Sequence, residues 1–479
     1  MLRLFSTYNV LAKSLGEDPD DQERLRFDHY ATFVQIISSV DRAEGINWEI
    51  FYARYNSSKS MFPNLSRLGC TILSLPFPIV SALLPPTLCS IVLISAEDSV
   101  VKHPLRNLLA ALSTSVCKIS DLSFDYYDNT EEQLTSIPAL QSLRRLTVDG
   151  PVSIAFLAAF HAENLTFLSL KMPLASDFNY TVFHGRFPNL DRLVVETNRG
   201  GANGMAQFVQ AVYSPRLRNL HLQIIDWLDW LEFRDPSAVE DTSNIHSTLS
   251  TYITKALSLS NDSLERLHFT YGSDTDQTPF NLHSCFIKLA LSFHLLTAVQ
   301  VDVKYTSLLV DDTSLASMAT SWPLLQSLRI KQELEEDLEP LDASDIAPTP
   351  HALQAFADRC PSLQELVVHC PFHTTTPSAI AAMTPLTQPT GRPGHLLRRL
   401  VVGPGDEEFD EPTRLRLALF VDALFPHLQG LESPLHDEYI PVGNLYSWPF
   451  GVQVTNTLVA MQTARRNAAL RGAGGTVDL

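Results

Sequence analysis

Residues 187–195 read Phe-Pro-Asn-Leu-Asp-Arg-Leu-Val-Val, and residues 62–70 read Phe-Pro-Asn-Leu-Ser-Arg-Leu-Gly-Cys. The two stretches share a proline, one further residue, and then the pattern Leu-x-x-Leu-x-apolar. Further copies with the proline occupy residues 214–222, 322–330, 360–368 and 425–431. Copies with a weaker start begin at Leu88, Ile119, Leu143, Leu165, Leu264, Leu296 and Leu397. The chain therefore carries thirteen copies in succession, and in seven of them a proline stands two residues before the first apolar residue.

Each copy combines signals for a short strand. Its second half alternates apolar and other residues, which predicts a strand with one buried face. The proline ends the preceding helix and has no N–H for a sheet ladder, so we expect it at the start of the strand. The first apolar residue of a copy is here called its first position. Successive first positions lie mostly 22–38 residues apart, with one longer gap of 47 residues.

The gaps between copies carry helix patterns. Residues 349–359 offer Thr349 as the N-cap, Pro350 in the first turn, and apolar residues at the spacing of one helix face. Residues 312–319 and 413–424 look similar. Strands that alternate with helices predict an α/β fold, a leucine-rich-repeat solenoid with a curved parallel sheet on its concave side and helices on its convex side. The alternative, an ordinary α/β sheet protein, would have fewer and longer strands together with phosphate-binding loops.

The repeat pattern also predicts the domain organisation. We expect residues 1–57 to form an N-terminal helical segment and residues 58–440 to form the repeat array. Residues 441–479 are expected to form a C-terminal helical cap and a flexible tail. The 71 leucines among 479 residues suit one continuous core, and a net charge of −18 disfavours a uniformly basic nucleic-acid binder.

The sequence predicts an intracellular protein, cytoplasmic or nuclear, that contacts neither membrane nor nucleic acid. The N-terminus lacks the apolar core of a signal peptide. Residues 68–96 carry no charge and are long enough to cross a bilayer, but they contain four prolines, which favour two buried repeat units over a membrane helix. The six cysteines form no CxxC pair, as expected for reduced thiols.

Candidate chemistry is sparse, and we expect no enzymatic activity, no cofactor and no metal. Residues 200–204 are rich in glycine but lack the Lys-Ser/Thr of a phosphate-binding loop, so they predict a turn before a helix at 205–212. His369-Cys370-Pro-Phe-His373, with Cys360 upstream, is either the end of a strand or a metal site. Trp227, Trp230 and Phe233 lie in the longest gap, either on a helix that packs inward or as an exposed anchor for a partner.

The outward strand positions form the predicted inner face. Each strand places two apolar residues in the core, so the three residues that flank and separate them face a partner. Of these 39 positions, eight are basic and seven are acidic, a charge density about twice that of the whole chain. This face is either a mixed-charge groove for a protein with acidic features or simply the polar surface of exposed strands. The candidate partner-binding residues are Arg145, Lys171, Arg192, Glu196, Asn219, His221, Arg266, His268, Arg329, Lys331, Glu365 and Arg399.

The irregular Pro-x-Leu-x-x-Leu-x-apolar units resemble the leucine-rich repeats of F-box proteins, especially their fungal members, over roughly residues 60–435. Residues 17–30 are similar to the linker and helix that follow the F-box in that family. The resemblance implies a non-enzymatic substrate receptor of a ubiquitin ligase, which binds its protein substrate through the repeats.

The F-box itself, a small helical module that docks on the ligase adaptor, would not fit in residues 1–15. Either the gene model is truncated, or the protein binds its partner without recruiting a ligase. We expect the adaptor to bind only if an F-box exists upstream. The alternative functions are a standalone repeat scaffold and, less favoured, an α/β enzyme with a dispersed site.

Overall fold

The computed structural model forms two compact units, Met1–Glu196 with Ala211–Arg216 (unit 1) and Thr197–Gln210 with Leu217–Leu479 (unit 2). Each unit is described by itself below. The residues that the structure describes are 29–37, 62–71, 84–94, 118–125, 142–149, 163–171, 180–198, 201–212, 214–226, 263–273, 280–281, 292–304, 308–333, 348–371, 395–403, 411–428, 430–432, 457–464 and 467.

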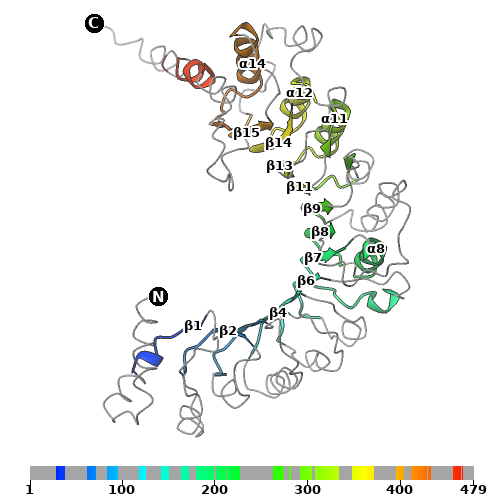
Figure 1. Ribbon diagram of the computed structural model, residues 1–479, viewed down its shortest axis with the longest axis vertical. Helices are drawn as coiled ribbons and strands as arrows, with labels where there is room; N and C mark the ends of the chain where they lie inside the picture. The colour runs from blue at the N-terminus through cyan, green and yellow to red at the C-terminus, as the bar shows by residue number, and fades with distance from the viewer. Residues whose placement is uncertain are drawn as a thin grey trace, which may run out of the picture. The chain divides into compact units, whose positions relative to one another are not determined.

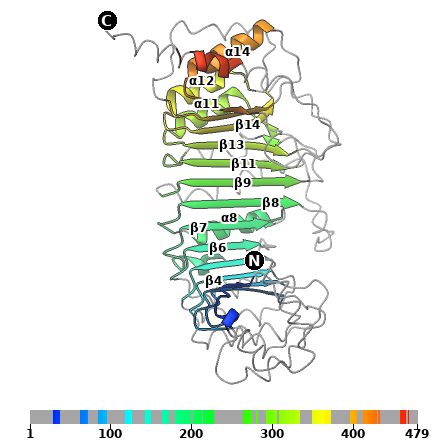
Figure 2. The same ribbon diagram turned by 90° about the vertical axis from the view of Figure 1, so that its left-hand side faces the viewer.

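Unit 1 contains parallel strands that pair in the order of the chain (Figure 2). A short 3-10 helix, η2 (Tyr180–Phe183), precedes the last of them. The strands are β1 (Ile36–Ile37), β2 (Arg67–Thr71), β3 (Ser90–Ile94), β4 (Asp121–Asp125), β5 (Arg145–Asp149), β6 (Phe167–Lys171) and β7 (Arg192–Thr197).

Unit 2 repeats this arrangement, with helices and with longer strands from β8 to β14 of its main sheet. Figure 1 shows α11 (Asp312–Ser321), α12 (His351–Arg359) and α14 (Glu411–Leu424) on one side of the strands. The helix α8 (Ala202–Ala211) also belongs to this unit, and β10 (Phe280–Asn281) pairs separately with β12 (Leu308–Leu309). The strands of the main sheet pair in the order β8 (Asn219–Asp226), β9 (Arg266–Ser273), β11 (Ala298–Lys304), β13 (Ser327–Glu333), β14 (Glu365–Pro371), β15 (Arg399–Gly403) and β16 (Gly430–Glu432).

The repeat pattern predicts these strands correctly. Each of the thirteen first positions lies two residues before a strand, and each is at least 97% buried. Neighbouring strands pair first residue to first residue, so that Arg145 of β5 aligns with Phe167 of β6 and Glu365 of β14 aligns with Arg399 of β15. The parallel pairing, the repeat length and the shared core confirm the leucine-rich-repeat solenoid.

The proline has a different place from the predicted one. In most of the proline-containing copies the N–H of the first position donates to the carbonyl oxygen three residues earlier, as from Leu190 to Phe187 (3.2 Å) and from Leu325 to Trp322 (3.1 Å). Proline is therefore the second residue of a β-turn, a position that its fixed φ favours. The strand begins four residues after the proline. The residue just before the proline, such as Phe187 or Trp322, is the first residue of the turn and is buried in the core.

A backbone ladder holds successive repeats in register. In most of the described repeats, the carbonyl oxygen just before the strand accepts two N–H groups from the next repeat, as Glu265 does from Thr297 (2.8 Å) and Ala298 (3.2 Å). The same pattern recurs at Thr166, Arg144 and Gln364. Pairing backbone groups in this way satisfies donors that would be costly to leave without partners.

The helices follow the predicted ranges, but the predicted N-cap of α12 is wrong. Pro350 occupies the cap position, and no side chain caps this helix end. Thr349 instead binds the preceding helix, because its backbone N–H and its hydroxyl both donate to the Asp312 carboxylate of α11, each at 2.6 Å. In α11 the cap is Asp311, which accepts from the N–H of Ser314 at 2.8 Å.

The glycine-rich segment is partly helical. The predicted turn at 200–204 is shorter than expected, because α8 begins at Ala202 rather than at Met205. The side chain of Asn198 accepts the N–H of Gly201 at 3.0 Å, which closes the turn earlier in the chain. Three residues of the predicted turn thus belong to the first helical turn.

The sheet also starts earlier than the repeat pattern indicates. Ile36 and Ile37 pair with Arg67 and Leu68, inside the segment that was predicted to be helical and ahead of the predicted boundary at residue 58. The sequence around β1 lacks the repeat pattern, so nothing in it marks the strand. The division into three segments otherwise stays a prediction, and the predictions for Trp227, Trp230 and Phe233 lie outside the described residues. Within the described ranges, no helix combines the length and apolarity needed to cross a membrane.

Candidate protein-binding surface

The outward side chains of the strands form a surface that we call the strand face of each unit. In β5, β6, β7 and β11 buried and part-exposed residues alternate, as strand geometry requires. In unit 2 the strand face of β8 to β13 lies opposite the helices, and no helix covers it in the part of the chain that the structure describes (Figure 1).

All twelve candidate residues lie at outward strand positions. Arg145, Arg192 and Arg266 are exposed, and the other nine are half-buried. The structure brings several of them together in small polar clusters within one unit, as described below. Their role in binding a partner stays a prediction.

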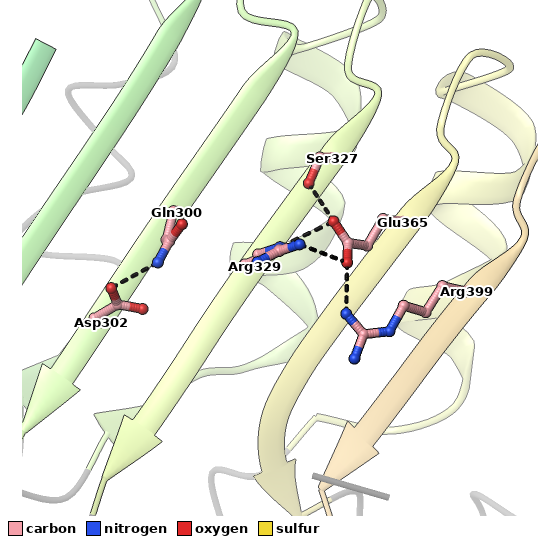
Figure 3. A network of polar contacts seen from close by, with 6 residues as sticks. All are labelled: Gln300, Asp302, Ser327, Arg329, Glu365 and Arg399. Carbon is pink, nitrogen blue, oxygen red and sulfur yellow. Dashed lines mark hydrogen bonds and ion pairs between the residues drawn. The ribbon is translucent and has the colours of Figure 1, made fainter. Parts of the chain in front are cut away.

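The first cluster, in unit 2, joins two histidines to one carboxylate. The rings of His221 and His268 are stacked, with centroids 3.8 Å apart and planes 12° apart. His268 Nε2 lies 2.6 Å from Asp302 Oδ2, to which Gln300 also donates at 2.7 Å (the latter drawn in Figure 3). The Thr270 hydroxyl lies 3.3 Å from each histidine Nε2. Since an ionised carboxylate only accepts, His268 donates to Asp302, which fixes the orientation of its ring.

Asp302 is held in its ionised form. Burial alone would raise the pKa of this carboxyl, but the hydrogen bonds from His268 and Gln300 and the charge of Lys331 outweigh burial and lower it. Its side chain is 13% exposed, and its Oδ1 is buried without a hydrogen bond to any residue that the structure describes. Asp302 therefore has acceptor capacity that the described neighbours leave unused.

The second cluster, also in unit 2, gathers three donors around Glu365 (Figure 3). Arg329 forms a two-pronged pair with it, Nε to Oε2 and Nη2 to Oε1, both at 2.9 Å. Arg399 Nη1 donates to Oε1 at 2.8 Å, and the Ser327 hydroxyl donates to Oε2 at 2.8 Å. The three donors come from β13 and β15, the two strands that flank β14.

Two arginines compensate the one carboxylate, so this cluster carries a surplus positive charge. Burial would raise the pKa of Glu365, which is 17% exposed, but the hydrogen bonds from Arg329, Arg399 and Ser327 lower it. Charge-assisted, two-pronged pairs of this kind are stronger than neutral hydrogen bonds and fix the guanidinium plane. Arg329 and Arg399 are therefore structural partners of Glu365 as well as candidate contacts for a partner protein.

In unit 1, Lys171 lies between two carboxylates on neighbouring strands. Its Nζ is 3.3 Å from Asp149 Oδ1 and 3.4 Å from Glu196 Oε1. Burial would lower the pKa of Lys171, but Glu196 and Asp149 outweigh burial and raise it. Burial also raises the pKa of Glu196, and here the attraction of Lys171 does not fully offset it, since Asp149 repels Glu196. The trio thus has one carboxylate more than it has cations.

Also in unit 1, two arginines bracket one aromatic ring. The guanidinium carbon of Arg145 lies 4.4 Å from the ring centroid of Phe167, and that of Arg192 lies 5.3 Å from the same centroid. Arg145 also approaches Asp121 at 3.6 Å across an exposed pair. Both distances to the ring lie within the range of a cation–π contact.

The outward positions are not exposed on every strand. Val367 of β14 and Val401 of β15 occupy the middle outward position, yet each is only 2% exposed. The prediction that they face a partner is therefore wrong. On these two strands the described outward residues that keep some exposure are Glu365 and Arg399.

Cys360, whose side chain is the described part of the cysteine and histidine cluster, is poorly suited to bind a metal. Cys360 is buried, and its thiol donates to the carbonyl oxygens of Ala319 (3.4 Å) and Trp322 (3.5 Å). Burial raises the pKa of this thiol to about 12, against a smaller opposing effect of Arg359. Because metals bind the thiolate, such a thiol is a poor ligand. No group of three potential ligands is gathered among the described residues, which do not include the side chains of residues 369–373.

No protein-family model matches the chain, and no curated protein sequence matches it. Among solved structures it is similar to the leucine-rich-repeat ectodomain of the plant membrane receptor kinase GASSHO1/SCHENGEN3 from Arabidopsis thaliana, determined in complex with CASPARIAN STRIP INTEGRITY FACTOR 2. The sequences are 12% identical, the TM-score is 0.26, and the match covers 78% of this chain and 47% of that chain. This chain therefore spans about half the length of that ectodomain.

The candidates chosen from the sequence include every basic member of these clusters, both histidines, Glu196 and Glu365, but neither the acidic partners Asp121 and Asp149 nor the uncharged partners. Phe167, Thr270, Gln300 and Ser327 take part in the contacts described above, but only their place in the repeat marks them. Alignment of the thirteen copies by first position places Phe167 between Arg145 and Arg192 and Ser327 beside Glu365, because neighbouring strands keep that alignment. Asp302 was counted on the inner face but was not selected as a candidate.

Proposed function

We propose that the chain is a protein-interaction module without enzymatic activity, which binds a protein partner on its strand face. The observation that carries the proposal is a parallel sheet in unit 2 whose described helices α11, α12 and α14 lie on one side, while the strand face of β8, β9, β11 and β13 keeps partly exposed polar side chains. Parallel sheets are normally covered on both faces. A face that is instead polar, ordered and open is suited to a second protein.

The polar clusters support this proposal because they are fixed before a partner arrives. His268 and Gln300 each bind Asp302, and Arg329 binds Glu365, through hydrogen bonds of 2.6–2.9 Å. Binding to ordered side chains loses less conformational entropy than binding to mobile ones. The strand face thus offers pre-oriented donors and acceptors.

The test compares two exposed arginines of unit 2 that lie on different surfaces. Arg266 is on the strand face and makes no ion pair with any residue that the structure describes, whereas Arg416 is exposed on the helix α14. The intact protein is used to capture partners from cell lysate, with Arg266→Glu and Arg416→Glu as matched variants. We expect Arg266→Glu to lose the captured protein and Arg416→Glu to keep it. Retention by Arg266→Glu together with loss by Arg416→Glu would place the interface on the helices and contradict the proposal.

We further propose that the partner is a substrate of a ubiquitin ligase and that the protein acts in the cytoplasm or nucleus. The support is the resemblance of residues 60–435 and 17–30 to F-box proteins. The test is whether the ligase adaptor copurifies with the intact protein and whether depletion of the protein prolongs the lifetime of the captured partner. Absence of the adaptor with an unchanged partner lifetime would favour a standalone scaffold.

A further inference from the structure

The strand face of unit 1 places two arginines and one phenylalanine in a single row. Arg145, Phe167 and Arg192 are the first residues of β5, β6 and β7, and the register aligns each with the next. The three side chains therefore project from adjacent strands at the same level of the sheet. Adjacent strands lie about 4.8 Å apart, so the two arginines start roughly 10 Å from each other.

The ring of Phe167 braces both guanidinium groups. The two guanidinium carbons lie 4.4 Å and 5.3 Å from its centroid, one arginine from each flanking strand. A guanidinium held against an aromatic face keeps its N–H edge free for an acceptor. The contact thus restricts two long side chains without using up their hydrogen-bond donors.

The positive charge of this row is largely uncompensated. Arg192 is exposed and makes no ion pair with any residue of the described ranges, and Arg145 has only the exposed 3.6 Å contact to Asp121. Exposed pairs of that length contribute little. On the same three strands, Lys171 is by contrast held between Asp149 and Glu196. The free positive charge is therefore concentrated at Arg145 and Arg192.

We infer that Arg145, Phe167 and Arg192 form an anchor for an acidic segment of the protein partner, an inference that rests on the proposed function. Guanidinium groups bind carboxylates through two parallel hydrogen bonds, and the exposed part of the ring accepts an apolar side chain between them. Because the arginines start two strands apart, the anchor suits a segment with two aspartate or glutamate residues rather than one. Nucleic acid is a poor occupant, since the chain as a whole carries a charge of −18.

The test selects peptides on the intact protein and measures their dependence on this row. A phage library of random dodecapeptides is selected on the wild-type chain, and the affinity of the recovered peptides is measured by fluorescence anisotropy for Arg192→Gln, Phe167→Leu and the control Arg144→Gln. Arg144 is the exposed neighbour of Arg145 just before β5, so its replacement removes the same charge next to the row.

We expect the recovered peptides to carry at least two acidic residues. Arg192→Gln should weaken their binding about tenfold and Phe167→Leu about threefold, the latter because it removes the bracing but no charge. Arg144→Gln should change the affinity less than twofold, and thermal unfolding should show that all variants stay folded. The affinity should also fall with added salt, less steeply in Arg192→Gln than in the wild type.

Three results would overturn the anchor. They are peptides without paired acidic residues, equal effects of Arg192→Gln and Arg144→Gln, and tighter binding of a single-stranded oligonucleotide than of the acidic peptides. None of these results would contradict the proposed function, because that function is tested separately at Arg266 in unit 2. If Arg266→Glu loses the captured partner while Arg192→Gln binds peptides like the wild type, the interaction module stands and the anchor is wrong.

Discussion

The two units use one repeat to build two kinds of strand face. In unit 1 the strands β2 to β6 have five residues each, and the pair of Arg145 with Asp121 is open to solvent. In unit 2 the main-sheet strands β8, β9, β11, β13 and β14 have seven or eight residues, and Glu365 is enclosed by three donors. The helices α11, α12 and α14 of unit 2 lie on the side of its strands that is opposite the strand face.

This difference in strand length accompanies a difference in repeat length. Gaps of 22–31 residues separate the first positions of unit 1, whereas gaps of 29–47 residues separate those of unit 2. Longer repeats leave room for a helix and for a longer strand, and a longer strand places more outward side chains side by side. The exposed pair of Arg145 with Asp121 is therefore expected to contribute little to stability, and the enclosed cluster around Glu365 is expected to contribute more.

The largest predicted effect lies in the core, where the two units should behave alike. Leu168→Ala in unit 1 and Leu328→Ala in unit 2 each remove a fully buried side chain from an inward strand position. We expect each to lower the free energy of unfolding by about 2–5 kcal/mol, measured by urea denaturation. The control Leu324→Ala, at a residue 47% exposed, should change it by less than about 0.5 kcal/mol. A small effect in only one unit would show that the two cores differ.

The next largest effect on the free energy of unfolding should differ between the two units. Glu365→Gln removes the charge that holds Arg329 and Arg399 together and leaves two guanidinium groups facing each other. We expect a loss of roughly 1–3 kcal/mol of unfolding free energy, kept modest because Arg329 is partly solvated. Asp121→Asn in unit 1 should cost less than about 0.5 kcal/mol. Equal losses would break the proposed link between burial and pair strength.

The pH dependence should have opposite signs at two carboxyls. The pKa of Glu365 is lowered in the folded state, so its stabilisation is present above the unfolded pKa of about 4.3 and is lost as the pH falls through the folded pKa. The pKa of Glu196 is raised, so its contribution makes the protein less stable as the pH rises through the interval above about 4.3. Urea midpoints between pH 3 and pH 7 should show a shallower acid-side loss for Glu365→Gln and a steeper one for Glu196→Gln. The same slope change in both variants would contradict these signs.

The smallest effects are expected at the arginines without ion pairs. Arg192→Gln in unit 1 and Arg266→Gln in unit 2 should each change the unfolding free energy by less than about 0.5 kcal/mol, because both side chains are exposed. Arg329→Gln should cost more, since it leaves Glu365 with a weaker set of donors. Thermal unfolding of the three variants side by side gives the comparison, and a large loss for Arg266→Gln would reveal a structural role for that residue.

The sequence predicts the fold well because the residues that form the buried core are also the residues that recur from repeat to repeat. Each first position recurs two residues before its strand, so the pattern predicts where the thirteen strands lie but not how long each one is. It could not predict β1, which lacks the pattern, or the binding of Thr349 to Asp312, which depends on how two helices pack. The site was predicted as a set of outward positions. Which of them would pair, as Arg329 and Arg399 do around Glu365, depends on side-chain conformations that no periodicity encodes.

The central claim is that a protein partner binds the strand face, and chemical labelling of histidines tests it most directly. His221 and His268 lie on the strand face of unit 2, whereas His294 and His427 are exposed at turns outside it. The captured complex and the free chain are treated with diethylpyrocarbonate, and the modification of each histidine is quantified by mass spectrometry. The account predicts that the partner lowers modification of His221 and His268 and leaves His294 and His427 unchanged. Protection of His294 or His427 with undiminished labelling of the stacked pair would contradict it.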